Sequence, residues 1–209
     1  MDLEKATSSD ACDPEALEYS NNFWKLYFSY LNFPEDRETF VSKSKEEREA
    51  ARHSLDLLAE QSSTKFQQFL NTTTCRNARV ASGLLLQFGN VCRTQPELSE
   101  SLMLDSDWSI RNSATQCEAK WIVSRDIETQ KRIVDKAVKQ MQLIHHTDRN
   151  KAIGLIMVAA TRNKDIARYI SNNYVTEITQ LGKTAKITNI TDPVKSILLA
   201  VHEVNSENK

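Results

Sequence analysis

The sequence predicts an all-helical protein built from repeated pairs of helices, and three observations lead to this prediction. Glycine and proline are scarce, with four of each among 209 residues, so the chain has little material for tight hairpins or phosphate-binding loops. Apolar residues recur at the spacing of an amphipathic helix, for example at Ala51, Leu55, Leu58 and Ala59. The third observation is a recurring pattern along the chain.

The recurring pattern opens on an Arg-Asn pair at residues 76, 111 and 149, at intervals of 35 (76 to 111) and 38 (111 to 149) residues. These intervals are typical of proteins in which each repeat is one supersecondary unit stacked on the next. Each unit has a long apolar helix, a polar break and a shorter helix. The long helices are AARHSLDLLAEQ, ARVASGLLLQFGNV, NSATQCEAKWIVSRD, NKAIGLIMVAATRN and DPVKSILLAVHEVN, and the short ones are TKFQQFL, PELSESLM, ETQKRIV and KDIARYI.

Three regions are expected along the chain: a disordered amino terminus at 1–14, a helical cap at 15–42, and a repeat domain of about four units at 43–209. The cap helix follows Asp13-Pro14, because Asp can cap a helix and Pro fits its first turn. This helix carries the densest aromatic cluster of the chain, which includes Trp24, Tyr27 and Phe28. We expect these rings to pack on the end of the helical stack or to form an exposed docking site.

Several boundaries follow from the same signals. One long helix is expected at 76–93, and one bent helix or two helices at 127–144. Gly182 is expected to end the helix 174–181 in the left-handed conformation. A loop at 183–191 then leads to a last helix that begins at Asp192-Pro193.

The cysteines and the amino terminus bear on location. The four cysteines show no CxxC pair and no zinc-type spacing with histidine, and three lie in apolar helical contexts. We therefore expect reduced, buried thiols in a cytoplasmic protein, with the nucleus as the alternative. The first residues are acidic and polar, unlike a signal peptide, and no run of 18 apolar residues is present. Insertion into a membrane is therefore not expected.

The alternating long and short helices at about 45–205 resemble the armadillo repeat family and its relative, the HEAT family. In armadillo proteins an Asn near the end of each long helix, four residues after a Trp, lines the concave groove and bonds an extended peptide. Asn90 resembles that position, and the steps of 35 and 38 residues place Arg125 and Asn163 there. Trp121 precedes Arg125 by four residues, and the last helix offers Asn205. The resemblance implies that these five residues bind a partner, although Arg replaces Asn at position 125.

The sequence contains few signals of an enzyme, a cofactor site or a metal site. No P-loop and no GxGxxG are present. His145 and His146 are adjacent, and adjacent residues on a helix point about 100° apart, so they chelate a metal poorly. No nucleophile signature surrounds the cysteines. We therefore expect a protein that is not an enzyme and has no cofactor and no metal site.

The sequence thus predicts a monomeric, non-catalytic scaffold or adaptor that binds a partner peptide or domain on its concave face. Two alternatives remain: a compact helical bundle that acts as a dimeric regulatory protein, and an RNA-binding helical domain. The net charge of −1 gives no global attraction to nucleic acid. A basic stripe would serve the RNA alternative. The candidate residues are a local cluster of Arg125, Lys131, Arg132, Lys136 and Lys139, and arginines that could align across the units, namely Arg76, Arg79, Arg93, Arg111, Arg149, Arg162 and Arg168.

Overall fold

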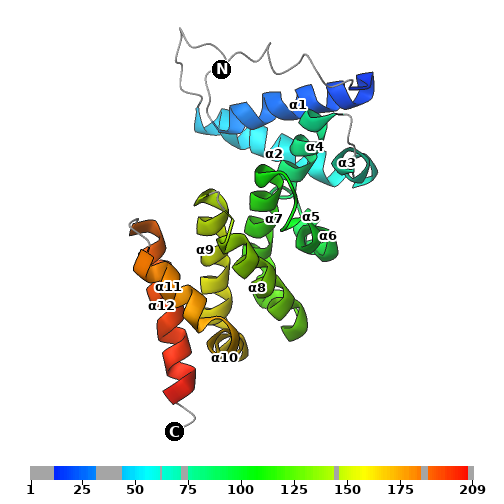
Figure 1. Ribbon diagram of the computed structural model, residues 1–209. Helices are drawn as coiled ribbons and strands as arrows, with labels where there is room; N and C mark the ends of the chain where they lie inside the picture. Colours follow the sequence, from blue (N-terminus) through cyan, green and yellow to red (C-terminus); the bar gives the residue numbers. More distant parts are fainter. Residues whose placement is uncertain are drawn as a thin grey trace. The chain divides into compact units, whose positions relative to one another are not determined.

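A computed structural model describes residues 12–31, 44–61, 63–71, 75–143, 146–184 and 188–206. Every regular element in these ranges is a helix (Figure 1), which confirms the all-α class. The disorder expected at 1–14 falls largely outside the described residues, since these begin at Cys12 and the first helix begins at Pro14. The chain forms two compact units, residues 1–94 and 95–209.

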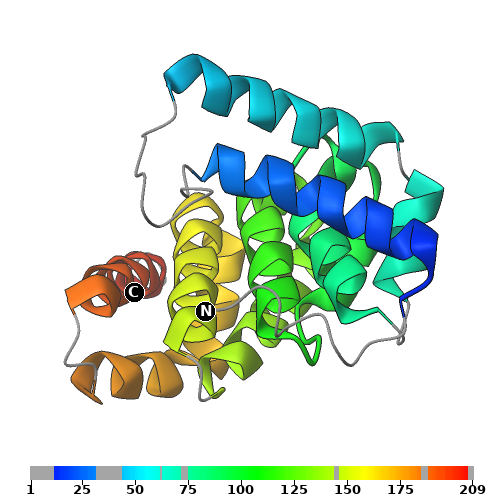
Figure 2. The ribbon, with the colours of Figure 1, turned by 90° about the horizontal axis from the view of Figure 1, so that it is seen from above.

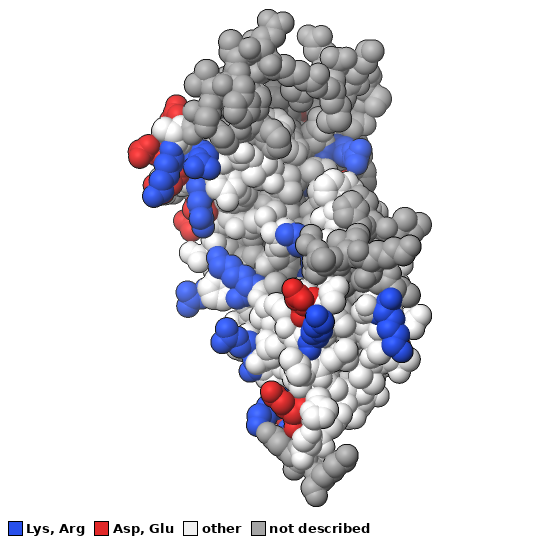
Figure 3. Space-filling model, turned by 90° about the vertical axis from the view of Figure 1, so that its left-hand side faces the viewer, with Lys and Arg blue, Asp and Glu red and all other residues white. Residues whose placement is uncertain are grey.

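The first unit contains α1 (Pro14–Tyr30), α2 (Lys45–Gln61), α3 (Ser63–Leu70), α4 (Arg76–Leu85) and α5 (Val91–Thr94). As predicted, the Asp13 side chain caps α1, since its Oδ1 accepts a hydrogen bond of 2.8 Å from the Ala16 N–H. Helices α1 and α2 lie side by side (Figure 2), and α1 also packs on α4. Basic and acidic side chains alternate over the exposed face of α2 (Figure 3). The core includes Phe23, Leu55, Phe69 and Leu85.

The single helix expected at 76–93 is wrong, because the chain breaks between α4 and α5. Gly89 adopts a φ of 58°, a left-handed conformation that ends a helix and favours glycine. The Gly89 N–H donates a hydrogen bond of 2.7 Å to Asp56 Oδ1 on α2. This hydrogen bond therefore holds the turn that follows α4 against α2.

A disulfide joins Cys12, just before α1, to Cys75, the residue that precedes α4. The expectation of reduced thiols is therefore wrong, and no described cysteine is free. Neither spacing nor motif signals this pair, because the two residues are 63 positions apart and only the fold brings them together. The cytoplasmic or nuclear location stays a prediction, and it loses the support that reduced cysteines would have given.

The second unit contains α6 (Pro96–Leu102), α7 (Trp108–Trp121), the 3₁₀ turn η2 (Ile122–Ser124), α8 (Ile127–Met141), α9 (His146–Arg162), α10 (Lys164–Asn173), α11 (Val175–Thr184) and α12 (Thr188–Ser206). Helix α9 packs against α7 on one flank and α12 on another. Helices α6, α8 and α10 pack on α7, α9 and α12 in turn, and α8 also touches α10 (Figure 1). Helix α8 has 15 residues and α7 has 14, so the expected alternation of long and short helices fails at α8.

Helix α9 buries one face, while residues such as Met157 and Val158 keep intermediate exposure. The burial nearly all round that its apolar sequence predicted is therefore confirmed only in part. Ala152, Ile153, Leu155 and Ile156 have no exposed surface. Residues 127–141 form one helix, α8. Among the described helices none is long and apolar enough to cross a membrane.

The Arg-Asn pattern has a structural role in this unit. The Arg111 guanidinium donates to the carbonyl of Asp105 in the turn that precedes α7, and to the buried carboxylate of Asp148 on α9 at 2.7 Å. Arg149 donates to the carbonyl of Met141 at the end of α8. In both copies the arginine therefore ties the start of a long helix to the segment before it.

The segment around residues 183–191 differs from expectation. Helix α11 continues to Thr184, and α12 begins at Thr188, so that Pro193 lies inside α12. Gly182 does not end a helix but lies within α11. A Cβ at this position would stand 2.8 Å from Cγ1 of Val194, so glycine permits the close approach of α11 to α12.

The expected cap at 15–42 contains α1, which belongs with α2–α5 to the first unit. Pro34, which was expected to end the cap helix, lies outside the described residues. The division into cap and repeat domain stays a prediction.

Candidate functional site

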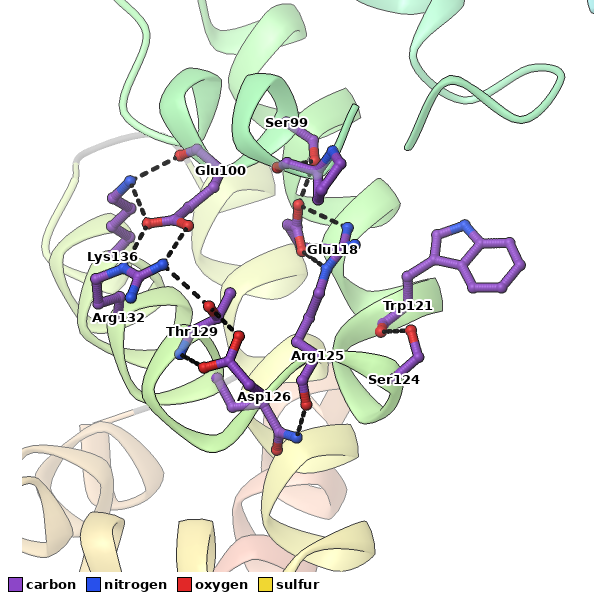
Figure 4. Close-up of polar contacts among 12 residues, drawn as sticks. Ser99, Glu100, Glu118, Trp121, Ser124, Arg125, Asp126, Thr129, Arg132 and Lys136 are labelled. Atoms are coloured by element: carbon purple, nitrogen blue, oxygen red, sulfur yellow. Dashed lines mark hydrogen bonds and ion pairs between the residues drawn. The ribbon is translucent and has the colours of Figure 1, made fainter. Parts of the chain in front are cut away.

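Arg125, a predicted partner-binding residue of the second unit, faces inward. Its Nε lies 3.3 Å from Oε2 of Glu118, and its side chain is 11% exposed while that of Glu118 is fully buried. Ser99 donates a further hydrogen bond to the Glu118 carboxylate (Figure 4). Burial raises the pKa of Glu118, while the bonds from Ser99 and Arg125 oppose this shift. The charge of Arg125 is therefore used within the protein.

Trp121 lies apart from this ion pair. Figure 4 shows its ring pointing away from Glu118 and Arg125. The ring is half-buried, and the Lys120 ammonium lies 5.3 Å from its centroid. Trp121 therefore presents an aromatic surface with a cation beside it.

Arg125 and Asn163 lie on one edge of the unit, joined by a residue that sequence reasoning missed. Gln130 donates from Nε2 to the Arg125 carbonyl at 2.8 Å and accepts from Asn163 Nδ2 at 3.1 Å. Asn163 also caps α10, since its Oδ1 accepts from the Asp165 N–H. Gln130 lies on α8, outside the register that predicted the ladder of polar residues.

The other two predicted residues make local contacts. Asn205 on α12 exchanges hydrogen bonds with Ser171 on α10 at 3.0 and 3.3 Å. Asn90, in the first unit, is exposed and donates to Glu60 Oε1 at 3.4 Å. The structure therefore links Arg125 with Asn163, places Asn205 against α10, and gives Asn90 a contact of its own within the first unit.

A cavity of about 510 Å³ lies beside Asn163, between the end of α9, the start of α10 and α12. This volume falls in the range of about 300–1,000 Å³ that is typical of ligand sites. Small side chains such as Ala160, Ala167 and Ala200 line it. Leu199, at 64% exposed, contributes an apolar surface. The polar groups that line the cavity are Thr161, Arg162, Asn163, Lys164, Ser196 and Glu203.

The aromatic residues of α1 pack mainly with one another and with Phe88. The Trp24 and Phe28 rings stack at 5.5 Å between centroids, and Tyr27 meets Phe88 edge-on at 6.2 Å. All three α1 rings keep intermediate exposure. The structure thus places Trp24, Tyr27 and Phe28 in a packed cluster whose outer side remains accessible.

The basic residues of α8 are engaged with carboxylates. Arg132 and Lys136 both pair with Glu100, at 3.2 and 3.0 Å. Burial alone would raise the pKa of Glu100, but the hydrogen bonds and charges of these two cations lower it. Lys131 pairs with Glu128 at 2.7 Å. Most cations expected for an RNA-binding stripe therefore have partners within the protein.

No protein-family model matches the chain, and no curated protein matches it.

Proposed function

We propose that this protein is a non-catalytic interaction module that binds an extended segment of a partner protein at the cavity between α9, α10 and α12. The observation that carries the proposal is the cavity of about 510 Å³ beside Asn163, one of the residues that the repeat pattern singles out. The protein would act as a scaffold or adaptor and work as a monomer.

An armadillo- or HEAT-like solenoid is the architecture that we propose for the repeat region. Its support is the packing order in the second unit, where α9 packs on both α7 and α12 and α8 touches α10. In such a stack each unit covers the apolar face of the next, and the ends of the long helices form an extended surface. The cavity would be one section of that surface.

The chemistry of the cavity suits a peptide. Alanine side chains at positions 160, 167 and 200 leave room for a backbone to approach, and the exposed Leu199 offers apolar contact. Beyond its bonds to Gln130 and to the Asp165 N–H, the Asn163 side chain keeps one N–H and one oxygen lone pair, which match the alternating groups of an extended chain. Arg162 forms no ion pair within the described part of the chain, so its charge is available for a carboxylate of the partner.

Photo-crosslinking tests this site. A photoreactive phenylalanine analogue at position 199 should crosslink to a partner in an extract of the source cells, and the same analogue at position 104 should not. Leu104 is the matched control, because it is also an exposed leucine of the second unit, at 43%. Leu199→Glu should then reduce capture of the identified partner by about tenfold or more.

Two results would count against the proposal. Capture that is unaffected by Leu199→Glu but lost with Leu104→Glu would place the interface on another face. A mass of twice 23.8 kDa in light scattering, with dimerisation lost on Trp24→Ala, would instead favour the dimeric bundle.

A further inference from the structure

A small cavity in the first unit lies between the end of α1 and the first turns of α2. Its volume is about 210 Å³, and it is lined by Tyr30, Lys45, Arg48, Glu49 and Arg52. Three of these five side chains are cationic. We propose that this cavity binds the phosphate group of a phosphorylated side chain on a partner protein. The site lies in a different unit from the cavity at α9, α10 and α12 and does not depend on it.

Helix geometry places the three cations together. Lys45, Arg48 and Arg52 are spaced by three and four residues, so they share one face of α2. Glu49 is the only carboxylate among the residues that line the cavity, and it lies 3.7 Å from Lys45. Neither arginine forms an ion pair with any residue that the structure describes. The cavity therefore carries excess positive charge.

The cap at the start of α2 holds the Glu47 carboxylate away from the cavity. The Glu47 Oε2 accepts a hydrogen bond of 2.7 Å from the Ser44 N–H, and the Ser44 Oγ accepts one of 3.1 Å from the Glu47 N–H. This reciprocal cap holds the Glu47 carboxylate at the helix terminus. The Glu47 carboxylate therefore does not line the cavity and does not neutralise Arg48 or Arg52.

The Tyr30 hydroxyl adds a hydrogen-bond donor to the cavity, on a ring that packing holds in place. Its ring meets Phe88 edge-on at 5.6 Å between centroids, which restricts its side-chain freedom. Guanidinium groups bind phosphate with paired, charge-assisted hydrogen bonds, and a phenol hydroxyl can add a further one. Two arginines, one lysine and one tyrosine around 210 Å³ thus match a single tetrahedral dianion.

The surroundings favour one phosphate over a nucleic-acid backbone. Glu46, Glu47 and Glu49 alternate with the cations along α2, and basic and acidic side chains lie side by side over this helix (Figure 3). A nucleic acid needs a continuous basic track with accessible aromatic faces. A phosphorylated serine or threonine carries its charge of about −1.5 to −2 at one point. The phosphopeptide is therefore the ligand that we infer.

NMR titration of the full chain tests the site with two short peptides of one sequence, one with phosphoserine and one with serine. The phosphoserine peptide should shift the side-chain Nε–H signals of Arg48 and Arg52, and the serine peptide should not. Arg48→Gln should weaken binding by about tenfold, because it removes a charge-assisted hydrogen bond. Lys25→Gln, an equal loss of charge at an exposed site of α1 outside the cavity, should change affinity by less than about twofold.

Three outcomes would overturn the proposal. Equal shifts with both peptides would show that the phosphate is not recognised. Equal losses from Arg48→Gln and Lys25→Gln would show that only net charge matters. Tighter binding of a poly(U) strand than of the phosphoserine peptide, again lost with Arg48→Gln, would assign the cavity to RNA.

Discussion

Arg125 and Arg132 each form an ion pair with a glutamate. The two pairs differ in burial, and burial determines how much the loss of one partner destabilises the protein. Arg125 and Glu118 are 11% and 0% exposed, whereas Arg132 is 55% exposed beside Glu100. Removal of one partner from a buried pair leaves a charge without compensation, while an exposed pair contributes little. Both pairs are visible in Figure 4. The main role of Arg125 is thus to stabilise the fold through its ion pair with Glu118.

Substitution of Arg125 should therefore destabilise the protein more than substitution of Arg132. Arg125→Gln should lower the free energy of unfolding by about 3 kcal/mol, and Arg132→Gln by less than about 1 kcal/mol. Chemical denaturation of both variants measures the difference. Equal midpoints would contradict the burial of Arg125, and would make Arg125→Gln a clean probe of partner binding.

At the scale of elements, the capped start of α1 was predictable, whereas the start of α12 and the helix breaks were not. Asp13 caps α1 as the sequence indicated, because capping is a contact between near neighbours. The break at Gly89 depends on Asp56 of another helix, and the place of Gly182 within α11 depends on Val194 of α12. Gln130 was missed for the same reason, since its partners lie 5 and 33 residues away. Local signals do not specify such contacts.

The packing of α1 on α4 should give the first unit a sensitivity to alkaline pH. Tyr19 on α1 is 8% exposed and accepts a hydrogen bond from Ser82 on α4. Burial raises the pKa of Tyr19 from 10.0 to about 12. Since the folded state holds the proton more tightly, its stabilising contribution is complete below pH 10.0 and is lost as the pH rises toward 12.

Spectrophotometric titration of the tyrosines measures this effect. Burial also raises the pKa of Tyr27, Tyr169 and Tyr174, so the wild-type chain should show one more late-titrating phenol than Tyr19→Phe. The variant should lose less stability between pH 10.0 and about 12. Tyr30→Phe serves as the control, because Tyr30 is only half-buried. An unchanged amplitude of the late component in Tyr19→Phe would assign that component entirely to other tyrosines.

At the scale of the whole molecule, each unit is held by a buried core and by polar or covalent links. In the second unit Ile153, Leu155 and Ile156 are fully buried, ion pairs and hydrogen bonds join its helices, and Cys117 is disulfide-bonded. Within the first unit a covalent bond joins residues 63 positions apart. A crosslink that closes such a loop stabilises by about 4 kcal/mol in the chain-entropy account.

Replacement of both Cys12 and Cys75 by serine should therefore lower the free energy of unfolding of the first unit by about 2–4 kcal/mol. Thermal and chemical unfolding of this double variant, compared with the intact chain under non-reducing conditions, measures the loss. Each single replacement should cost about as much as the double one, because either removes the same bond. An unchanged transition would mean that α1 and α4 hold together without the bond.

The bond between Cys12 and Cys75 also makes everything between them a ring. A protease that cuts the backbone once within residues 13–74 opens the ring without releasing a piece, so the two fragments travel together on a gel until a thiol is added. A cut within residues 76–91 frees a fragment at once, because it lies outside this ring. The pattern of bands with and without reductant would therefore report where on the chain an enzyme first gains access.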